Sequence, residues 1–437
     1  MDAQLLPRSA EANERLHRLV PGGAHTYAKG EDQYPEGLAP VISHGRGAHV
    51  WDVDGHEYIE YGSGLRSVSL GHAHPRVVEA VRRELERGTN FVRPGIIELA
   101  AAERFLATVP TADMVKFAKN GSDATTAAVR LARAVTGRRV AAVCGDQPFF
   151  STDDWFIGTT GMPAGIPGDI TDLTVRFPYG DLAATEEVLR RHDVACLLLE
   201  AATAVEPPPG YLAGLRALAD RYGVVLIFDE MITGFRWSEA GAQGYYGVTP
   251  DLSTFGKALG NGFAVSALAG RRELMELGGL RDSRERVFLL STTHGAETHS
   301  LAAAMAVIDT YVAEGITARL HALGERLAAG VRDVAAAMGV GDHVVVRGRA
   351  SNLVFGTLDE QLRPSQQYRT LFLRQLVAGG VLGPSFVVSS ALTETDIDRT
   401  VDVVAQACAV YRKALDVEDP TPWLGGRSVK PVFRPYA

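Results

Sequence analysis

Residues 250–262 read PDLSTFGKALGNG, which places a lysine, Lys257, among apolar residues and glycines. Upstream, residues 223–230 read GVVLIFDE, an apolar run typical of a buried strand that ends on Asp229 and Glu230. Burial lowers the pKa of an ammonium group because it disfavours the charged form, so a buried lysine offers a free amine. Together the two runs predict a lysine and a carboxylate at the ends of adjacent parallel strands.

Such a pair meets the needs of pyridoxal phosphate chemistry. The lysine amine binds the aldehyde of the cofactor, and the carboxylate keeps the pyridine nitrogen protonated so that the ring accepts electrons. We therefore predict that Lys257 and Asp229 are catalytic residues and that both bind the cofactor. The alternative is that Asp229 and Glu230 are a solvated pair of charges at a strand end.

The bulk composition limits the class of protein. The chain has 437 residues, of which 46% are hydrophobic, enough for one large core and a smaller second domain. The net charge is −8 and no long basic run occurs, which argues against nucleic acid as a partner. Three cysteines without CxxC spacing, and a start without a continuous apolar stretch, favour a cytoplasmic protein that has neither a signal peptide nor a membrane span.

The middle of the chain has the pattern of an α/β protein. Apolar strand-like runs alternate with helical stretches from about residue 75 to residue 270, which is typical of a parallel sheet covered on both faces. The candidate strands are 114–118, 140–144, 195–199, 224–228 and 265–269.

The flanking regions predict smaller elements. Residues 48–53 and 57–61 are strand-like runs joined by Asp54-Gly55, a hairpin signal. The stretch 302–337 reads as one long helix that leads into an α+β domain containing a strand at 353–357. The predicted organisation is an N-terminal segment with short strands (1–70), a large cofactor-binding domain (71–315), a small domain (316–415) and an extended tail (416–437).

A candidate anion site precedes the catalytic pair. Gly121 and Ser122 follow a candidate strand and begin a helix, so they would present backbone amides and a hydroxyl at a helix N-terminus. Ordinary helix capping is the alternative. The position of this turn in the same sheet as Asp229 and Lys257 favours a phosphate site.

His72 and His74 have a spacing that metal sites also use. They lie in a loop that leads into a helix, and the sequence places no third ligand beside them. We therefore expect a structural role and no metal site.

Taken together, these segments resemble the class III, fold-type I aminotransferases that depend on pyridoxal phosphate, and within them the glutamate-1-semialdehyde aminomutase-like group. The likeness runs from about residue 21 to about residue 400. The segments that carry it are PGG at 21–23, WDVDG at 51–55, LGHAHP at 70–75, AVRLAR at 128–133, FDE at 228–230, TGFR at 233–236, the Lys257 loop, GV at 380–381 and PS at 384–385. The resemblance implies an α/β fold with a mostly parallel seven-stranded sheet in the large domain and a smaller α+β domain.

The resemblance also implies roles for individual residues. Gly121 and Ser122 would form the phosphate cup, and Thr292, or Thr293 one register further on, would reach the phosphate of the neighbouring subunit. This implies a homodimer with active sites at its interface. The remaining implied cofactor contacts are Phe149 or Phe150, stacked on the ring, and Met231, on the opposite face of the ring.

Departures from the aminomutase pattern bear on the substrate. Lys29 stands where the aminomutases have a carboxylate-binding arginine, and a lysine cannot form the bidentate fork of a guanidinium. An apolar run, 386–388, replaces the glutamate of their mobile gating region, and Leu65 replaces a pocket tryptophan. The polar residues expected in the substrate pocket are His25, Tyr27, Lys29 and Arg66, although Lys29 and Arg66 are also explicable as surface charges.

These residues predict a pyridoxal-phosphate-dependent aminotransferase that moves an amino group between an amino donor and a carbonyl substrate. A hydroxylated, sugar- or cyclitol-like biosynthetic intermediate is the expected substrate. The first alternative is an aminomutase or epimerase of the glutamate-1-semialdehyde aminomutase type, and a more remote one is a non-catalytic binding protein on the same fold.

Overall fold

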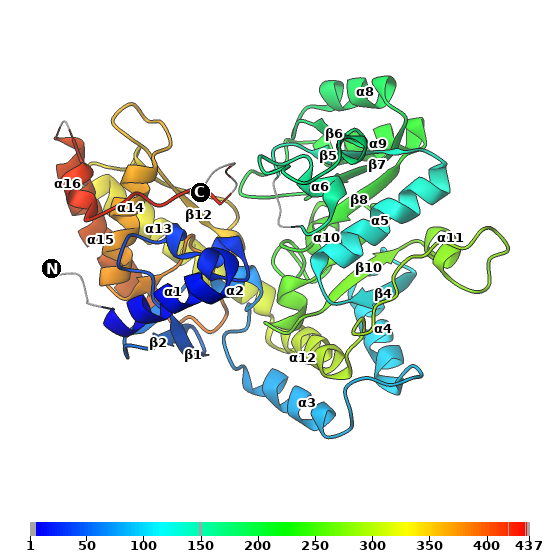
Figure 1. Ribbon diagram of the computed structural model, residues 1–437, viewed down its shortest axis with the longest axis horizontal. Coiled ribbons are helices and arrows are strands. Elements are labelled where there is room, and N and C mark those ends of the chain that lie inside the picture. The colour runs from blue at the N-terminus through cyan, green and yellow to red at the C-terminus, as the bar shows by residue number, and fades with distance from the viewer. Residues whose placement is uncertain (1–5, 148–150, 418, 433, 435–437) are drawn as a thin grey trace. The chain divides into compact units, whose positions relative to one another are not determined.

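The computed structural model describes residues 6–147, 151–417, 419–432 and 434. The chain divides into two compact units (Figure 1). Unit 1 contains the chain up to His74 together with Ala318–Arg434, and unit 2 contains Pro75–Thr317. The N-terminal segment therefore belongs to the same compact unit as the C-terminal residues.

Unit 2 is built on a seven-stranded sheet with the order β4-β10-β9-β8-β7-β5-β6. The pairs from β9 to β6 are parallel, whereas β10 is antiparallel to both of its neighbours. Because β4 and β9 are both antiparallel to β10, β4 runs in the same direction as β9 and β8. The strands are β4 (Met114–Ala118), β5 (Val140–Cys144), β6 (Thr174–Phe177), β7 (Val194–Leu199), β8 (Val225–Asp229), β9 (Leu252–Phe255) and β10 (Ser266–Gly270).

This architecture confirms the predicted α/β fold with a mostly parallel seven-stranded sheet. The five candidate strands each coincide with an observed strand to within one residue. Two further strands, β6 and β9, complete the sheet. Strand β9 lies inside the run that carries Lys257.

Helices cover both faces of the sheet. Side chains alternate along a strand, so Val225 and Ile227 of β8 pack on the face covered by α5, whereas Leu226 and Phe228 pack on the face covered by α9. Asp229 continues the first series and belongs to the α5 face. The helices of unit 2 are α3 (Pro75–Leu85), α4 (Ile96–Thr108), α5 (Gly121–Thr136), α6 (Asp154–Ile157), α7 (Gly168–Thr171), α8 (Leu182–Arg191), α9 (Tyr211–Tyr222), α10 (Gly241–Tyr246), η4 (Lys257–Gly260), α11 (Arg272–Met275), η5 (Glu276–Gly278) and α12 (Thr298–Glu314).

Unit 1 contains a four-stranded sheet with the order β1-β2-β3-β13 and a two-stranded sheet, β11-β12. The predicted hairpin is present as the antiparallel pair β2 and β3. Strand β13 adds to β3 in parallel, which joins the C-terminal part of the chain to the N-terminal sheet. The elements are α1 (Pro7–Leu19), η1 (Pro21–Gly23), η2 (Tyr27–Lys29), η3 (Glu31–Gln33), β1 (Ile42–Arg46), β2 (His49–Asp52), β3 (Glu57–Glu60), α2 (Ser63–Arg66), β11 (Val344–Arg347), η6 (Ala350–Asn352), β12 (Val354–Thr357), α14 (Gln366–Ala378), β13 (Val381–Leu382), α15 (Glu394–Leu415) and α16 (Thr421–Leu424).

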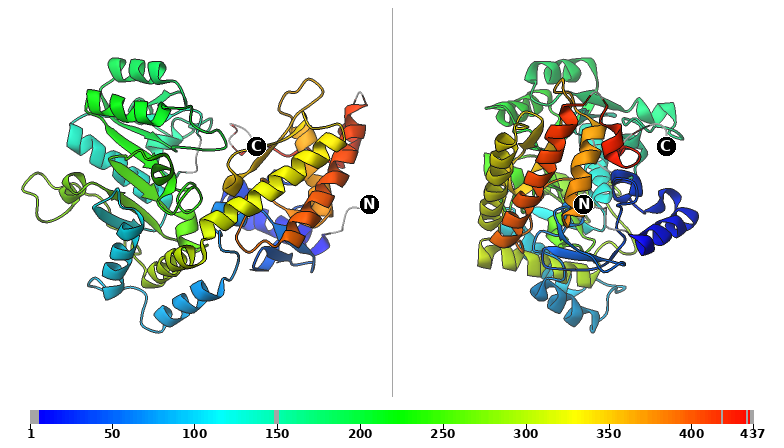
Figure 2. Two further views of the ribbon diagram at one scale, coloured as in Figure 1. Left: turned by 180° about the vertical axis from the view of Figure 1, so that it is seen from behind. Right: turned by 90° about the vertical axis from the view of Figure 1, so that its left-hand side faces the viewer.

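The prediction of a single long helix at 302–337 is wrong. The structure has two helices, α12 and α13 (Ile316–Ala337), with a break between them (Figure 2). The break falls at Gly315, whose φ of 60° lies in the left-handed region that ends helices. In the described part of the chain, no single helix is long and apolar enough to cross a membrane.

A buried carboxylate, Glu230, organises the turn that follows β8. Its side chain is completely buried, and it accepts hydrogen bonds from the backbone amides of Ala242 at 2.7 Å and Gln243 at 2.9 Å. The hydroxyl of Thr233 also donates to it. Asp229 is only 2% exposed, so the interpretation of the two residues as a solvated pair is wrong. Glu230 instead ties the end of β8 to the start of α10.

The burial of Glu230 predicts a pH-dependent stability. Burial raises the pKa of Glu230 from 4.5 to about 7, so between these pH values the folded protein holds a proton that the unfolded chain has lost. The stability contributed by this residue should therefore fall as the pH rises from about 4.5 to about 7, by about 3 kcal/mol in total. The free energy of unfolding, measured with urea from pH 5 to pH 8, should depend less on pH for Glu230→Gln than for the wild type.

The matched control for this comparison is Glu273→Gln, which removes an exposed carboxylate from the same unit. Its pH profile should follow that of the wild type. Parallel profiles for the wild type and Glu230→Gln would contradict the assignment of the raised pKa to Glu230.

Candidate active site

Asp229 ends β8 at the edge of the sheet where β4 and β9 also end. Its Oδ1 accepts hydrogen bonds from the amide of Met231 at 2.9 Å and from the hydroxyl of Thr254 at 3.3 Å. Burial raises the pKa of Asp229, and the positive charge of Lys257 and these hydrogen bonds oppose that rise. The carboxylate is thus held in a fixed direction and is sensitive to the charge of the lysine.

Lys257 follows β9, the parallel neighbour of β8, with Asp229 paired in register to Thr254. The backbone of Lys257 has a φ of 47°, in the left-handed region that residues other than glycine rarely adopt. Strain of this kind persists where the surrounding structure holds a residue in place, and it is frequent at functional sites. The two residues predicted to be catalytic therefore lie at the same ends of adjacent parallel strands.

The candidate phosphate cup lies at the same edge. Strand β4 ends at Ala118, and α5 begins at Gly121 with Asn120 in the N-cap position. Asp123 closes this first turn by accepting the amide hydrogen of Asn120 at 2.8 Å, and the hydroxyl of Ser122 accepts the amide hydrogen of Thr152 at 3.2 Å. The turn directs the positive end of a 16-residue helix at this edge, which suits an anion.

Met231 connects the cup to the lysine turn. A Cβ added at Gly121 would lie 3.1 Å from Sδ of Met231, and one added at Gly256 would lie 2.6 Å from the same atom. Both glycines are thus in close contact with one thioether, so the cup, Met231 and the residue before Lys257 form one local cluster. Phe149 and Phe150, which we expected to stack on the ring, lie outside the described residues.

Thr292 and Thr293 lie in an exposed turn that precedes α12. The carbonyl of Thr292 accepts the amide hydrogen of Gly295 at 3.3 Å, and the carbonyl of Thr293 accepts a hydrogen bond from the side chain of Asn90 at 2.9 Å. Both residues are therefore exposed on the surface of unit 2.

The four residues expected to contact substrate belong to unit 1. His25, Tyr27 and Lys29 are exposed in the segment that contains η1 and η2. Arg66 is half-buried, and its Nε donates to Oδ1 of Asn352 at 2.8 Å. An interpretation of Arg66 as a solvated surface charge does not fit this contact.

Arg66 ends a left-handed turn. Ser63, Gly64, Leu65 and Arg66 have φ values from 45° to 72°, a run that L-residues rarely form because each non-glycine member costs about 1–2 kcal/mol. The hydroxyl of Ser63 donates to the carbonyl of Val387 at 3.1 Å, which helps to hold the turn.

Sequence reasoning missed one hydrogen-bond partner of a predicted residue in each unit. Thr254 hydrogen-bonds Asp229, and Asn352 orients Arg66, although neither was predicted. Thr254 was detectable in principle, because it stands three residues before Lys257 in an otherwise apolar run. Asn352 was not, since its contact spans 286 residues.

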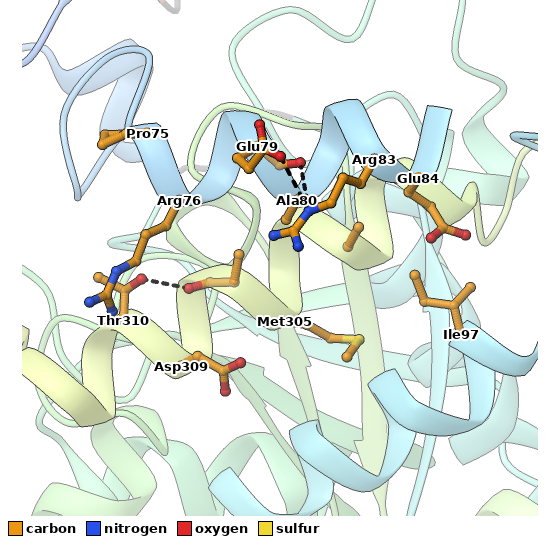
Figure 3. A pocket seen from close by; sticks show the side chains of 12 residues that line it. Pro75, Arg76, Glu79, Ala80, Arg83, Glu84, Ile97, Met305, Asp309 and Thr310 are labelled. Carbon is orange, nitrogen blue, oxygen red and sulfur yellow. Dashed lines mark hydrogen bonds and ion pairs between the residues drawn. The ribbon is translucent and has the colours of Figure 1, made fainter. Parts of the chain in front are cut away.

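A groove of about 750 Å³ lies elsewhere in unit 2, between α3, α4 and α12 (Figure 3). Arg76, Glu79 and Arg83 of α3 line it together with Met305 and Asp309 of α12. None of the predicted site residues lines this groove. Its lining combines these charged side chains with the apolar residues Ala80, Ile97 and Met305.

Known proteins resemble this chain over most of its length. The profile of the family "Aminotransferase class-III" matches residues 28–160 and 180–385. A glutamate-1-semialdehyde 2,1-aminomutase from Methanothrix thermoacetophila is 32% identical, over 94% of this chain and 98% of the relative.

Two solved structures extend the comparison. An omega-transaminase from Sphaerobacter thermophilus is 29% identical with a TM-score of 0.82, covering 92% of this chain and 97% of that chain. A transaminase with pyridoxal phosphate bound is 26% identical with a TM-score of 0.85, covering 95% of this chain and 100% of that chain. The protein described here therefore belongs to the class III aminotransferase family and is an enzyme that uses pyridoxal 5′-phosphate.

Proposed function

We propose that the cluster around Lys257 binds pyridoxal phosphate and that the protein uses it to move an amino group by an aminomutase-type reaction. The observation that carries the cofactor site is the placement of Lys257 and the buried Asp229 at the same ends of two adjacent parallel strands. When bound, the cofactor supplies an aldehyde that takes up amines and a pyridinium ring that accepts electrons from the substrate carbon.

Lys257 is proposed to hold the aldehyde and then to move a proton between the substrate carbon and C4′ of the cofactor. The side chain of Lys257 is partly buried, and an amine close to the reacting carbon is suited to pass a proton between two atoms. The left-handed backbone of Lys257 fixes the start of the side chain while its four methylene groups allow the amine to move.

Asp229 is proposed to hold the pyridine nitrogen in its protonated form. The amide of Met231 and the hydroxyl of Thr254 direct Oδ1, and burial strengthens the attraction between the carboxylate and a cation. The cup residues Gly121 and Ser122 would bind the phosphate at the N-terminus of α5. Met231 would pack on one face of the ring.

The partner subunit is proposed to complete the phosphate site through Thr292 or Thr293. An exposed apolar segment lies beside this turn, because Thr298, just beyond the turn, donates hydrogen bonds to the carbonyls of Gly88 and Thr89. An apolar surface at this place supports a homodimer. The exposed apolar side chains of this segment are Phe91, Val92, Ile96 and Leu99.

Light scattering should give the mass of two chains, and the mass of one chain would contradict the dimer.

The aminomutase outcome rests on the relatives and replaces our preference from sequence for a two-substrate aminotransferase. The relative from Methanothrix thermoacetophila spans nearly the whole chain and carries the name of an aminomutase. An aminomutase returns the amino group to the same carbon skeleton, so it needs no separate acceptor. Glutamate-1-semialdehyde is the substrate to test first.

Transamination of a hydroxylated carbonyl compound is the second candidate, and one observation favours it. The run 386–388, which stands where the aminomutase-like group has its mobile gate, is completely buried in unit 1. The amide of Phe386 donates to the carbonyl of Leu353 at 3.1 Å, and its ring packs edge-on against Tyr61. A segment fixed in this way is unsuited to gate a substrate, and Arg66 and Lys29 are polar groups that suit hydroxyls.

Turnover with and without an acceptor separates these two reactions. The proposal predicts that the holoenzyme converts glutamate-1-semialdehyde into 5-aminolevulinate without an added amino donor or keto acid. Activity that requires a donor, with release of a stoichiometric keto acid, would contradict the aminomutase and support transamination.

Replacement of Asp229 tests the role of the carboxylate. Asp229→Asn keeps the size of the side chain and an acceptor for Met231 but loses the charge. We expect the variant to retain covalently bound cofactor, while turnover falls about a hundredfold or more because the ring no longer holds its proton. Asp220→Asn, an exposed position on α9, should leave turnover unchanged. Undiminished turnover by Asp229→Asn would contradict the assignment.

A further inference from the structure

An ion pair joins the phosphate cup to the turn that carries Thr292. Lys119 stands between β4 and Asn120, and its Nζ lies 2.8 Å from Oε2 of Glu297. Glu297 occupies the N-cap position of α12, directly after the turn. The contact spans 178 residues and connects two segments that both take part in the proposed phosphate site.

The ion pair is shielded on the side of the carboxylate. The side chain of Glu297 is 16% exposed and that of Lys119 is 39% exposed. His294 and His299 lie 3.5 Å and 3.9 Å from oxygens of the same carboxylate. Lys119 is the main cause of the lowered pKa of Glu297, so the carboxylate stays ionised over the physiological range.

The turn that carries Thr292 and Thr293 has contacts besides the ion pair. A Cβ added at Gly295 would lie 2.8 Å from Oγ1 of Thr292, so the threonine hydroxyl folds over the glycine. The side chain of Asn90 also donates a hydrogen bond to the carbonyl of Thr293. The ion pair and Asn90 are thus two separate anchors for one turn.

Charge alone does not explain why Glu297 is there. A carboxylate beside a phosphate site repels the phosphate, and it also cancels the attraction that Lys119 would exert. A lysine without this partner would favour the anion more strongly. The carboxylate therefore has to contribute through geometry if it contributes at all.

We propose that Lys119 and Glu297 are a positioning pair that fixes the Thr292 turn against its own subunit, in the orientation in which the turn reaches the phosphate held by the cup of the partner subunit. This inference rests on the proposed cofactor site. In a two-fold symmetric dimer each phosphate site has the cup of one subunit and the threonine turn of the other, so loss of the pair in both subunits weakens both sites equally.

The experiment is a double-mutant cycle on cofactor affinity. Pyridoxal phosphate is titrated into the full-length apoenzyme, and the visible absorbance of bound cofactor gives Kd for the wild type, Lys119→Met, Glu297→Gln and the double variant. Each single variant should weaken binding about fivefold, and the double variant should be no weaker than either single one. The charge-swapped variant Lys119→Glu with Glu297→Lys should recover part of the affinity.

The sign of the Glu297→Gln effect is the decisive readout. If Lys119 acts only by its charge, Glu297→Gln tightens binding or leaves it unchanged, and the proposal is overturned. A fall in the melting temperature of the apoenzyme that parallels the loss of affinity, with no recovery by the charge swap, would also overturn it by showing general destabilisation.

Matched controls come from a second ion pair of the same unit. Arg76 and Glu314 lie 3.3 Å apart and are partly exposed, so Arg76→Met and Glu314→Gln should leave Kd unchanged. A wild type that binds no cofactor would refute the proposed cofactor site itself. A wild type that binds normally, with single variants that bind equally well, would refute the positioning pair alone.

Discussion

The structure depends on the placement of a carboxylate and an amine of opposite charge at the ends of two adjacent buried strands. Burial opposes the ionised form of Asp229, and the charge of Lys257 partly offsets this penalty. The arrangement requires β8 and β9 to be parallel neighbours in register, which in turn requires the helices that cover both faces of the sheet. The alternation along β8 then puts Asp229 on the face where α5 begins.

The neighbouring residues Asp229 and Glu230 have different roles because their carboxyl groups have different hydrogen-bond partners. Asp229 accepts two hydrogen bonds on one oxygen, whereas Glu230 is enclosed by the amides of α10 and the hydroxyl of Thr233. Both are buried, but only the first lies on the α5 face beside the lysine turn. One residue anchors the fold and the other serves the proposed chemistry.

Much of the fold could be predicted because its signals are local. Apolar runs between helices revealed the central strands, and Asp54-Gly55 revealed the hairpin of unit 1. Strand β9 was hidden because Ser253 and Thr254 interrupt its apolar pattern, and the break at Gly315 was hidden because apolar residues continue on both sides. Contacts that span long stretches of sequence, such as Arg66 with Asn352 and Lys119 with Glu297, have no local signal. The same holds for the pairing of β3 with β13, which brings the two ends of the chain into one unit.

The central claim is that the amine of Lys257 carries the cofactor, and peptide mapping tests it most directly. The protein would be loaded with pyridoxal phosphate, reduced with borohydride, digested and analysed by mass spectrometry. The account predicts one stable adduct, on the peptide that contains Lys257. An adduct confined to another lysine, or no adduct at all, would contradict it.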